Sequence, residues 1–341
     1  MADDLLSHAF AQVLATSCTP AHVRSIERGG NASALWMSIE MSGFCDALVE
    51  EEDGGAGLSL SDAFELMALA GEHALPLPFA LTMLLRPWVA RVRGEVGPGS
   101  LTLACDAVRD ATGSIAADAV PYGLVADRVV AAIQGRALIL DSAAAERVPT
   151  GVHGSLDADM TWPATAALAG ESEPFADARA VGALACAAQI AGAIRAVLDR
   201  SVGYASTRKQ FGRPIGKFQA IQHQLSVLAC EAHASHMAAQ MGCASQGAVP
   251  HPLLVAIAKA RCSEAAASAA AIAHAVHGAI GITEECDLQL YTRRLHQWRL
   301  AYGTESYWNL EVGRRLVDGS SDLLTFLREQ VFASCRQVAQ A

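Results

Sequence analysis

The stretch that decides the fold is YASTRKQFGRPIGKFQAIQ, residues 204–222. Its first half carries a basic residue, Arg208, ahead of a Phe211-Gly212 pair and a proline. From its second half onward, apolar residues recur at spacings of three and four, at Phe218, Ile221, Leu225 and Leu228. That spacing places one apolar stripe along a helix. We therefore expect a basic turn that leads into an amphipathic helix.

Long Ala-rich segments lie on both sides of this turn. Their patterns predict helices over 175–208, 216–246, 250–279 and 303–340, which suffice for a four-helix bundle. Between 95 and 174, short Val- and Leu-rich runs predict strands, most clearly a hairpin of Arg128–Ile133 with Arg136–Asp141. The predicted fold class is mainly α with a small β-domain: an N-terminal helical domain (1–94), a middle β-domain (95–174) and a C-terminal four-helix bundle (175–341).

Composition narrows the class of protein. With 341 residues, 52% of them hydrophobic, the chain can bury a large core in two or three packed units. The net charge of −10 opposes binding to nucleic acid or to an anionic membrane surface. The uncharged run 265–283 approaches the length of a membrane span, but its Ala, Ser, Gly and His content predicts a buried helix instead.

Cysteine usage and the N-terminus bear on the compartment. Nine cysteines occur singly, which predicts reduced core thiols in a cytoplasmic protein: Cys18, Cys45, Cys105, Cys186, Cys230, Cys243, Cys262, Cys286 and Cys335. The acidic N-terminus lacks the features of a secretory signal. His233 and His236 stand three apart without a facing carboxylate pattern, so no metal site is predicted.

Residues 204–222 resemble the pattern R-x-x-F-G-x-x-I-x-x-F-Q-x-I-Q of the FAD-dependent acyl-CoA dehydrogenases almost position for position. In that family the arginine meets the FAD pyrophosphate across a subunit interface. The resemblance therefore implies cofactor-binding roles for Arg208, Phe211 and Gln219. A guanidinium pairs bidentately with phosphate and stays charged. The alternative is a basic helix end placed for its own dipole and solvation.

A second stretch, HAVHGAIGITE at 274–284, resembles the family's Q-x-x-G-G-x-G-x-x-x-E loop. The resemblance implies that Gly278 and Gly281 let the backbone approach the dinucleotide. Ala275 replaces the glutamine and Ala279 replaces the second glycine. We therefore expect FAD to bind weakly or to be shared across a subunit interface.

The family's catalytic glutamate is missing. Residues 302–304, Tyr-Gly-Thr, align with the active-site E-G-T, whose glutamate removes the α-proton of an acyl-CoA thioester. Tyr302 stands at that base position, but an unperturbed phenol titrates near about 10. Some branches place the base on the first bundle helix, near Gly182 here, where Asp177 is the nearest carboxylate. Glu305 is the replacement candidate, although a glutamate there also suits the helix dipole. Thr304 is expected to contact the cofactor.

Three functional hypotheses remain open. In the first, the chain is the weaker subunit of a heteromeric acyl-CoA dehydrogenase for bulky acyl-CoA esters, as in steroid or fatty acid degradation, and a partner supplies the base. The absence of the family's T-E-P-x-A-G-S-D and W-x-T-N-G segments between 95 and 174 agrees with it. In the second, a self-sufficient homo-oligomer uses a non-standard base, which is Glu305 or another residue. In the third, the chain binds CoA esters without redox chemistry. The resemblance also implies an electron-transfer flavoprotein as electron acceptor.

Overall fold

The computed structural model describes residues 2–94, 97–166, 173–175, 177–245, 247–319 and 322–333. The chain divides into two compact units. The first unit comprises Met1–Leu66, Leu75–Ala185 and Ser245–Pro250, and the second comprises Met67–Ala74, Cys186–Ala244 and His251–Ala341. Most of the N-terminal helical part and both four-stranded sheets fall in the first unit, whereas most of the helical bundle and residues 67–74 fall in the second. The division into three domains, 1–94, 95–174 and 175–341, remains a prediction.

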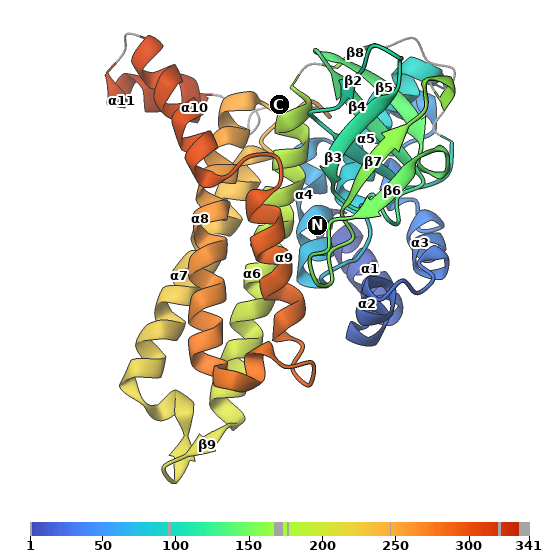
Figure 1. The fold of residues 1–341 in the computed structure, drawn as a ribbon. Helices are drawn as coiled ribbons and strands as arrows, with labels where there is room; N and C mark the ends of the chain where they lie inside the picture. The colour runs from blue at the N-terminus through green and yellow to red at the C-terminus, as the bar shows by residue number, and fades with distance from the viewer. Residues whose placement is uncertain are drawn as a thin grey trace. The chain divides into compact units, whose positions relative to one another are not determined.

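The N-terminal part is helical (Figure 1), with α1 (Ala2–Ser17), α2 (Pro20–Glu27), α3 (Ser33–Glu40), α4 (Leu60–Glu72) and α5 (Phe79–Arg93). A capping box begins α4: the Ser59 hydroxyl donates to the Asp62 carboxylate at 2.6 Å, and the Asp62 N–H donates to Ser59 Oγ at 3.3 Å. Two prolines, Pro76 and Pro78, separate α4 from α5 because proline lacks the N–H that a helix needs.

Two four-stranded sheets follow. One has the order β1 (Leu101–Ala104), β4 (Arg128–Ile133), β5 (Arg136–Asp141), β8 (Glu173–Pro174), with β1 and β4 parallel. The other is antiparallel, in the order β2 (Val108–Arg109), β3 (Ile115–Val120), β7 (Ala158–Trp162), β6 (Glu146–Pro149). The predicted hairpin is confirmed: β4 pairs with β5, and Gln134 and Gly135 have φ values of 51° and 79°, as a type I′ turn requires.

The two sheets share one core. Val129 and Leu140 on the first sheet and Met160 and Trp162 on the second are buried in a single cluster. The Trp162 indole N–H donates to the carbonyl of Asp141 at 2.9 Å, which ties β7 to the end of β5. Because a buried aromatic ring must also satisfy its polar atom, this bond explains why a tryptophan fits there.

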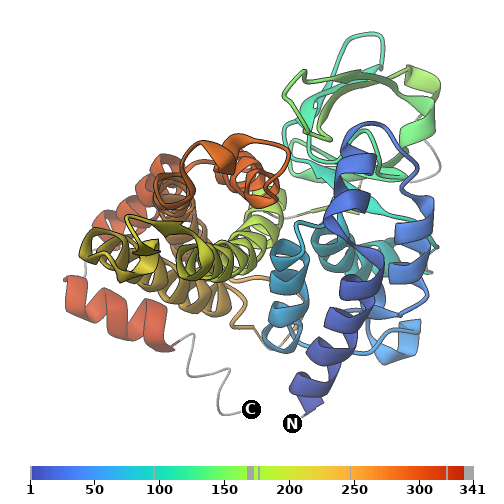
Figure 2. The ribbon, with the colours of Figure 1, turned by 90° about the horizontal axis from the view of Figure 1, so that it is seen from below.

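The second unit is built from long helices, namely α6 (Ala178–Thr207), α7 (Gln219–Gly242), α8 (Pro252–His277), α9 (Leu288–Leu300) and α10 (Glu305–Asp318). Helix α8 packs against α7, α9 and α10, and Figure 2 shows the bundle nearly along its axes. The apolar stripe predicted on α7 faces this bundle, since Leu228 is fully buried and Phe218, Ile221 and Leu225 pack on a buried cluster. The first three predicted bundle helices are thus confirmed with slightly shorter bounds.

The prediction of one helix over 303–340 was wrong. Helix α10 ends at Asp318, and α11 (Leu323–Phe326) continues into a π-helical turn, η7 (Leu327–Phe332). Asp322 begins α11 by accepting hydrogen bonds from the N–H groups of Leu324 and Thr325 at 2.9 and 3.1 Å. Turn-forming residues at 318–322 therefore favour a new helix start over continuation. Residues 334–341 lie outside the described residues. Helix α9 was not predicted from periodicity.

Among the described residues, two helices are long and apolar enough to cross a membrane by length and composition, namely α6 and Pro252–Ile282. In α6, 89% of the apolar window is buried within the structure, and in Pro252–Ile282 the share is 44%. The apolar length of α6 is therefore accounted for by packing inside the protein. For the second helix, packing accounts for less than half of the window.

The described cysteines are free thiols. Five of them are buried, as predicted for core residues: Cys18, Cys45, Cys186, Cys243 and Cys262. The prediction does not hold for Cys230, which is exposed, and Cys105 and Cys286 are half-buried. Cys335 lies outside the described residues.

Helices α4 and α6 touch at two glycines. A Cβ on Gly192 would lie 1.8 Å from the carbonyl oxygen of Ala68, and one on Gly71 would lie 1.9 Å from that of Gln189. Gly192→Ala is therefore expected to lower the free energy of unfolding by about 2–3 kcal/mol, because the two backbones must separate. Urea unfolding measures this change.

Gly203 on the same helix provides the control. No atom lies within 4 Å of its would-be Cβ. Gly203→Ala should therefore leave stability unchanged or raise it by up to about 1 kcal/mol, the difference in helix propensity. Equal small effects of the two substitutions would show that α4 and α6 do not touch in this way.

Candidate functional site

A cavity of about 490 Å³ lies in the second unit, between the turn after α6 and the end of α8. It brings together the two sequence motifs, since Arg208 and Phe211 line it from one and Gly278 from the other. The chain separates these motifs by about seventy residues. The cavity is therefore the place where the two predicted cofactor-binding stretches meet.

A two-stranded hairpin presents Phe211 beside the cavity. It consists of β9 (Lys209–Gln210) and β10 (Arg213–Pro214), and Figure 1 shows β9 at the tip of the bundle, beyond α6 and α7. Phe211 and Gly212 form the turn with φ values of 51° and 81°. The Phe211 side chain is 90% exposed, and its ring centroid lies 6.0 Å from that of Phe218. A large apolar ring held out in this way is available for contact with another molecule.

Arg208 lies just beyond the end of α6. Its backbone N–H donates to the Tyr204 carbonyl at 2.8 Å, and its carbonyl accepts from the Ile215 N–H at 2.8 Å. The backbone is thus fixed on both sides. Its guanidinium is exposed and has no hydrogen-bond or ion-pair partner within the described part of the chain. The charge is therefore free to bind an anion, although a cation is also favourable at a helix C-terminus.

An uncharged aromatic stack forms another wall. The Tyr204 ring lies 4.5 Å from the His277 ring at an angle of 21°, and the Tyr204 hydroxyl donates to the His277 carbonyl at 3.3 Å. His277 Nδ1 donates to the carbonyl of Ala273 at 2.9 Å. Burial lowers the pKa of His277, so its imidazole is neutral at neutral pH. Sequence reasoning missed Tyr204, whose signal is its position one turn before Arg208.

The two predicted glycines differ in their surroundings. Gly278 ends α8 with φ 66° and ψ −151°, a conformation that glycine adopts readily, and it lines the cavity. Gly281 is buried and does not line it. A Cβ on Gly281 would lie 3.1 Å from atoms of both His277 and Leu288, so the close packing there accounts for a small residue without any contact to a cofactor. Gln219, the exposed first residue of α7, also does not line the cavity.

The turn that carries Tyr302 lies at the other end of α9. The 13 residues of α9 span about 20 Å, which separates this turn from the glycine loop. Tyr302 is 9% exposed and has a φ of 57°, and its carbonyl accepts from the Trp308 indole N–H at 3.1 Å. A Cβ on Gly303 would come within 2.9 Å of the Trp308 ring nitrogen. Thr304 occupies the N-cap position of α10 and is not a lining residue of the cavity.

Lys259 holds this turn, and sequence reasoning missed it. Its ammonium is fully buried and donates to Ser263 Oγ at 2.9 Å, to the Arg299 carbonyl at 2.9 Å and to the Gly303 carbonyl at 3.0 Å. Burial lowers the pKa of Lys259, while neighbouring thiols and the Glu305 carboxylate oppose that shift. An ammonium at the carbonyl end of α9 also suits the helix dipole. The only signal in the sequence is that lysine is rare here, with three in the chain.

Glu305 is engaged in an ion pair. Arg299 Nε donates to Glu305 Oε2 at 3.0 Å, and its Nη2 donates to Oε1. The hydrogen bonds from Arg299 lower the pKa of the Glu305 carboxyl. A general base for a carbon acid needs a free oxygen and a raised pKa. In Glu305, by contrast, both carboxylate oxygens accept hydrogen bonds from Arg299 and the pKa is lowered.

Comparison with known proteins identifies the family. A family model described as "Acyl-CoA dehydrogenase, C-terminal domain" matches residues 177–317. A relative named acyl-CoA dehydrogenase IpdE2, from Mycobacterium tuberculosis, is 32% identical over 300 residues, which cover 86% of this chain and 90% of the relative. The chain belongs to the acyl-CoA dehydrogenase family. The predictions of this family and of an oxidoreductase are confirmed.

Solved structures of acyl-CoA dehydrogenases have the same fold. The ChsE4–ChsE5 complex from Mycobacterium tuberculosis gives a TM-score of 0.81 at 21% identity and covers 94% of this chain and 98% of that one. A glutaryl-CoA dehydrogenase from Mycobacterium smegmatis in complex with FADH2 gives 0.74 at 15% identity and covers 95% and 96%. The predicted acyl-CoA dehydrogenase fold class is therefore confirmed.

The residues at the cavity fit one part of the cofactor that the acyl-CoA dehydrogenase family uses. A pyrophosphate would meet the exposed guanidinium of Arg208, and an adenosine ring system would meet the exposed Phe211 ring. The neutral His277 adds no second charge. About 490 Å³ lies within the usual range of ligand cavities. In the part of the chain that the structure describes, no cluster of three or more His, Cys, Asp or Glu could hold a metal ion.

Proposed function

We propose that the chain is one subunit of a heteromeric acyl-CoA dehydrogenase. This subunit contributes to FAD binding but lacks its own catalytic base. The reaction would be the α,β-dehydrogenation of an acyl-CoA thioester. One contrast within the second unit carries the proposal. Among the described residues the Arg208 guanidinium beside the cavity has no partner, whereas the turn at the base position presents a tyrosine and, at Glu305, a glutamate that Arg299 already binds.

The chemistry requires a carboxylate or an equivalent base at the substrate's α-carbon. FAD, when bound, accepts the hydride from the β-carbon. Tyr302 offers a phenol where the reaction needs a carboxylate, and a phenol, which titrates near about 10 when unperturbed, is a poor base for the α-proton at neutral pH. Since the Glu305 carboxylate is ionised and paired with Arg299, the base would have to come from another subunit.

In this arrangement, Arg208 and the exposed ring of Phe211 would bind the pyrophosphate and the adenosine half of FAD held mainly by the partner. An exposed hairpin at the bundle tip suits a contact between subunits. The ChsE4–ChsE5 complex, which pairs two differently named chains, supports the idea of unlike partners. We further propose an electron-transfer flavoprotein as the electron acceptor.

The visible spectrum of the purified chain tests the proposal. We expect a colourless protein that acquires flavin absorption only when it is co-expressed with a second acyl-CoA dehydrogenase subunit that carries the glutamate. A chain that is yellow alone, and whose flavin band bleaches when an acyl-CoA is added, would eliminate the dependent-subunit hypothesis. It would favour the self-sufficient homo-oligomer instead.

Glu305→Gln separates these two hypotheses by kinetics. We expect the kcat of the assembled enzyme to stay within about twofold, because the glutamate forms an ion pair whose removal costs about 1 kcal/mol or less of stability. Glu311→Gln, which removes the neighbouring Glu311–Arg314 pair on the same helix, is the matched control. A loss of kcat of about 100-fold or more in Glu305→Gln alone would identify Glu305 as the base.

A further inference from the structure

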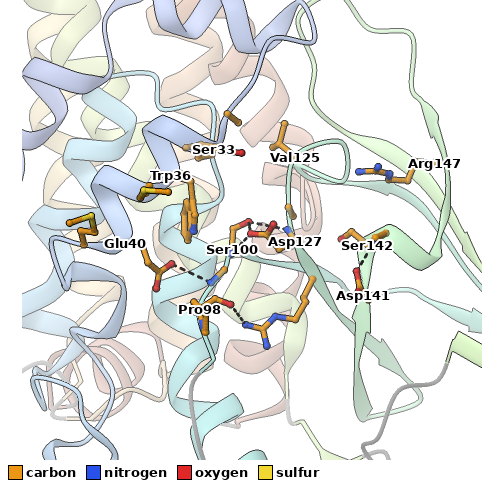
Figure 3. A pocket seen from close by; sticks show the side chains of 18 residues that line it. Ser33, Trp36, Glu40, Pro98, Ser100, Val125, Asp127, Asp141, Ser142 and Arg147 are labelled. Atoms are coloured by element: carbon orange, nitrogen blue, oxygen red, sulfur yellow. Dashed lines mark hydrogen bonds between the residues drawn. The ribbon is translucent and has the colours of Figure 1, made fainter.

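A second cavity, of about 740 Å³, lies in the first unit and is separate from the candidate FAD site. It opens between α3 and the loops at the N-terminal ends of β1 and β4. Figure 3 shows Trp36 and Glu40 on the side of α3, and Ser142 and Arg147 on the side of the strands. Its volume falls within the range of small-molecule sites, about 300–1,000 Å³.

The charged groups around this cavity are already engaged. The Asp127 carboxylate accepts from the N–H and the hydroxyl of Ser100, both at 2.7 Å. Glu40 binds the buried Arg86 at 2.6 Å. The Arg128 guanidinium donates to two carbonyls at 2.8 and 2.9 Å, and Arg147 donates to a third at 3.3 Å. Because both signs are present and have partners within the chain, the site favours neither an anion nor a cation.

Two neutral polar atoms at the cavity have no partner among the described residues. The Trp36 indole nitrogen is buried without a hydrogen bond, and so is the hydroxyl oxygen of Ser142, a residue that is 2% exposed. Buried polar groups are nearly always hydrogen-bonded, and leaving one unpaired is costly. The indole can only donate, whereas the hydroxyl can donate or accept. Both can bind an oxygen atom of a ligand.

The remaining lining is apolar. Trp36 and Met37 contribute from α3, Leu77 lies just before α5, and Val125 precedes β4. Met37 is 60% exposed, so an apolar side chain is left in water at the rim. Burial of such surface against a ligand is favourable.

We propose that this cavity binds a neutral, mainly apolar organic molecule that carries a hydroxyl or carbonyl oxygen. The oxygen hydrogen-bonds with the Ser142 hydroxyl, and the carbon skeleton covers Trp36, Met37 and Val125. The charged lining groups, including Asp141, which accepts from the Ala143 N–H at 2.8 Å, are satisfied within the chain, so the site offers no free charge to a charged ligand. The proposed ligand site does not depend on FAD binding at Arg208 or on the dehydrogenation proposed above, because its residues belong to the first unit.

Fluorine NMR of the intact protein labelled with 5-fluorotryptophan tests this site with 1-naphthol as the probe. The chain has five tryptophans, and Trp36→Phe identifies the resonance of Trp36 by its loss. We expect that resonance to shift saturably with 1-naphthol. Ser142→Ala should weaken the binding about two- to tenfold, the effect of one hydrogen bond. Ala143→Phe, at an exposed lining position, should abolish it by filling the entrance.

Two results would overturn the proposal. One is the absence of a saturable shift of the Trp36 resonance up to the solubility limit of 1-naphthol. The other is equal binding of naphthalene-1-sulfonate, which would mean that the site recognises apolar area alone and neither the hydroxyl nor the neutrality of the ligand. Circular dichroism of Ser142→Ala and Ala143→Phe establishes that each variant is folded. Neither result depends on flavin content or dehydrogenase activity.

Discussion

Replacing Arg208 by methionine is expected to weaken FAD binding to the assembled enzyme about 10- to 100-fold. Methionine keeps much of the length of the side chain but removes its charge, and a charge-assisted bond to phosphate contributes about 1.5–3 kcal/mol. Within the described residues the guanidinium has no other partner, so its loss should not disturb the fold. Retention of flavin after gel filtration and quenching of flavin fluorescence measure the effect.

Lys217→Met is the matched control for Arg208→Met. Lys217 lies in the same connection between α6 and α7, is exposed and does not line the cavity. Lys217→Met removes one positive charge, as Arg208→Met does, so a general electrostatic effect on FAD affinity would appear equally in both variants. Unchanged FAD affinity in Arg208→Met would mean that the arginine only terminates α6 and does not bind the cofactor.

Lys259→Met is expected to lower the free energy of unfolding by about 3 kcal/mol. The substitution removes a buried charge, which by itself is favourable, but it leaves the carbonyls of Arg299 and Gly303 without their donor. Because those carbonyls flank Tyr302, the turn should loosen before the bundle unfolds. Urea unfolding gives the stability change, and amide hydrogen exchange at residues 301–304 reports the local opening.

The exposed Lys217 again serves as the control, and Lys217→Met should change stability by less than about 0.5 kcal/mol. If Lys259→Met were as stable as the wild type, the turn would be held by the Trp308–Tyr302 bond and the Arg299–Glu305 pair alone. Faster amide hydrogen exchange at residues 301–304 without any loss of global stability would instead show that Lys259 stabilises only this turn.

Local chemistry made much of the fold predictable. The Gln134-Gly135 turn fixed the hairpin because both residues needed positive φ, and the structure has that register. The three-and-four spacing on α7 identified its buried face. The helix over 303–340 was wrong since turn residues near Asp318 interrupt it. Such errors arise where a local stop signal competes with an Ala- and Leu-rich pattern.

The candidate site was predictable only in part. The family motif located Arg208 and Phe211, and the structure places both at one cavity with Gly278. The stack of Tyr204 on His277 joins residues 73 positions apart, and no spacing within one helix indicates such a contact. The same holds for Lys259, whose two carbonyl partners lie 40 and 44 positions away. These contacts join different helices of the bundle, α6 with α8 and α8 with the end of α9, and sequence patterns do not encode such packing.

Exchange of the substrate's α-proton tests most directly whether the chain lacks its own base. The chain alone, supplied with FAD, is incubated in D2O with straight-chain, branched and ring-bearing acyl-CoA thioesters, whose binding is checked by calorimetry. Mass spectrometry of the recovered thioesters then reports deuterium at the α-carbon. We expect no incorporation above a heat-denatured control, and incorporation once a glutamate-bearing partner subunit is added. Deuterium uptake with the chain alone, abolished by Glu305→Gln, would contradict the dependent-subunit proposal.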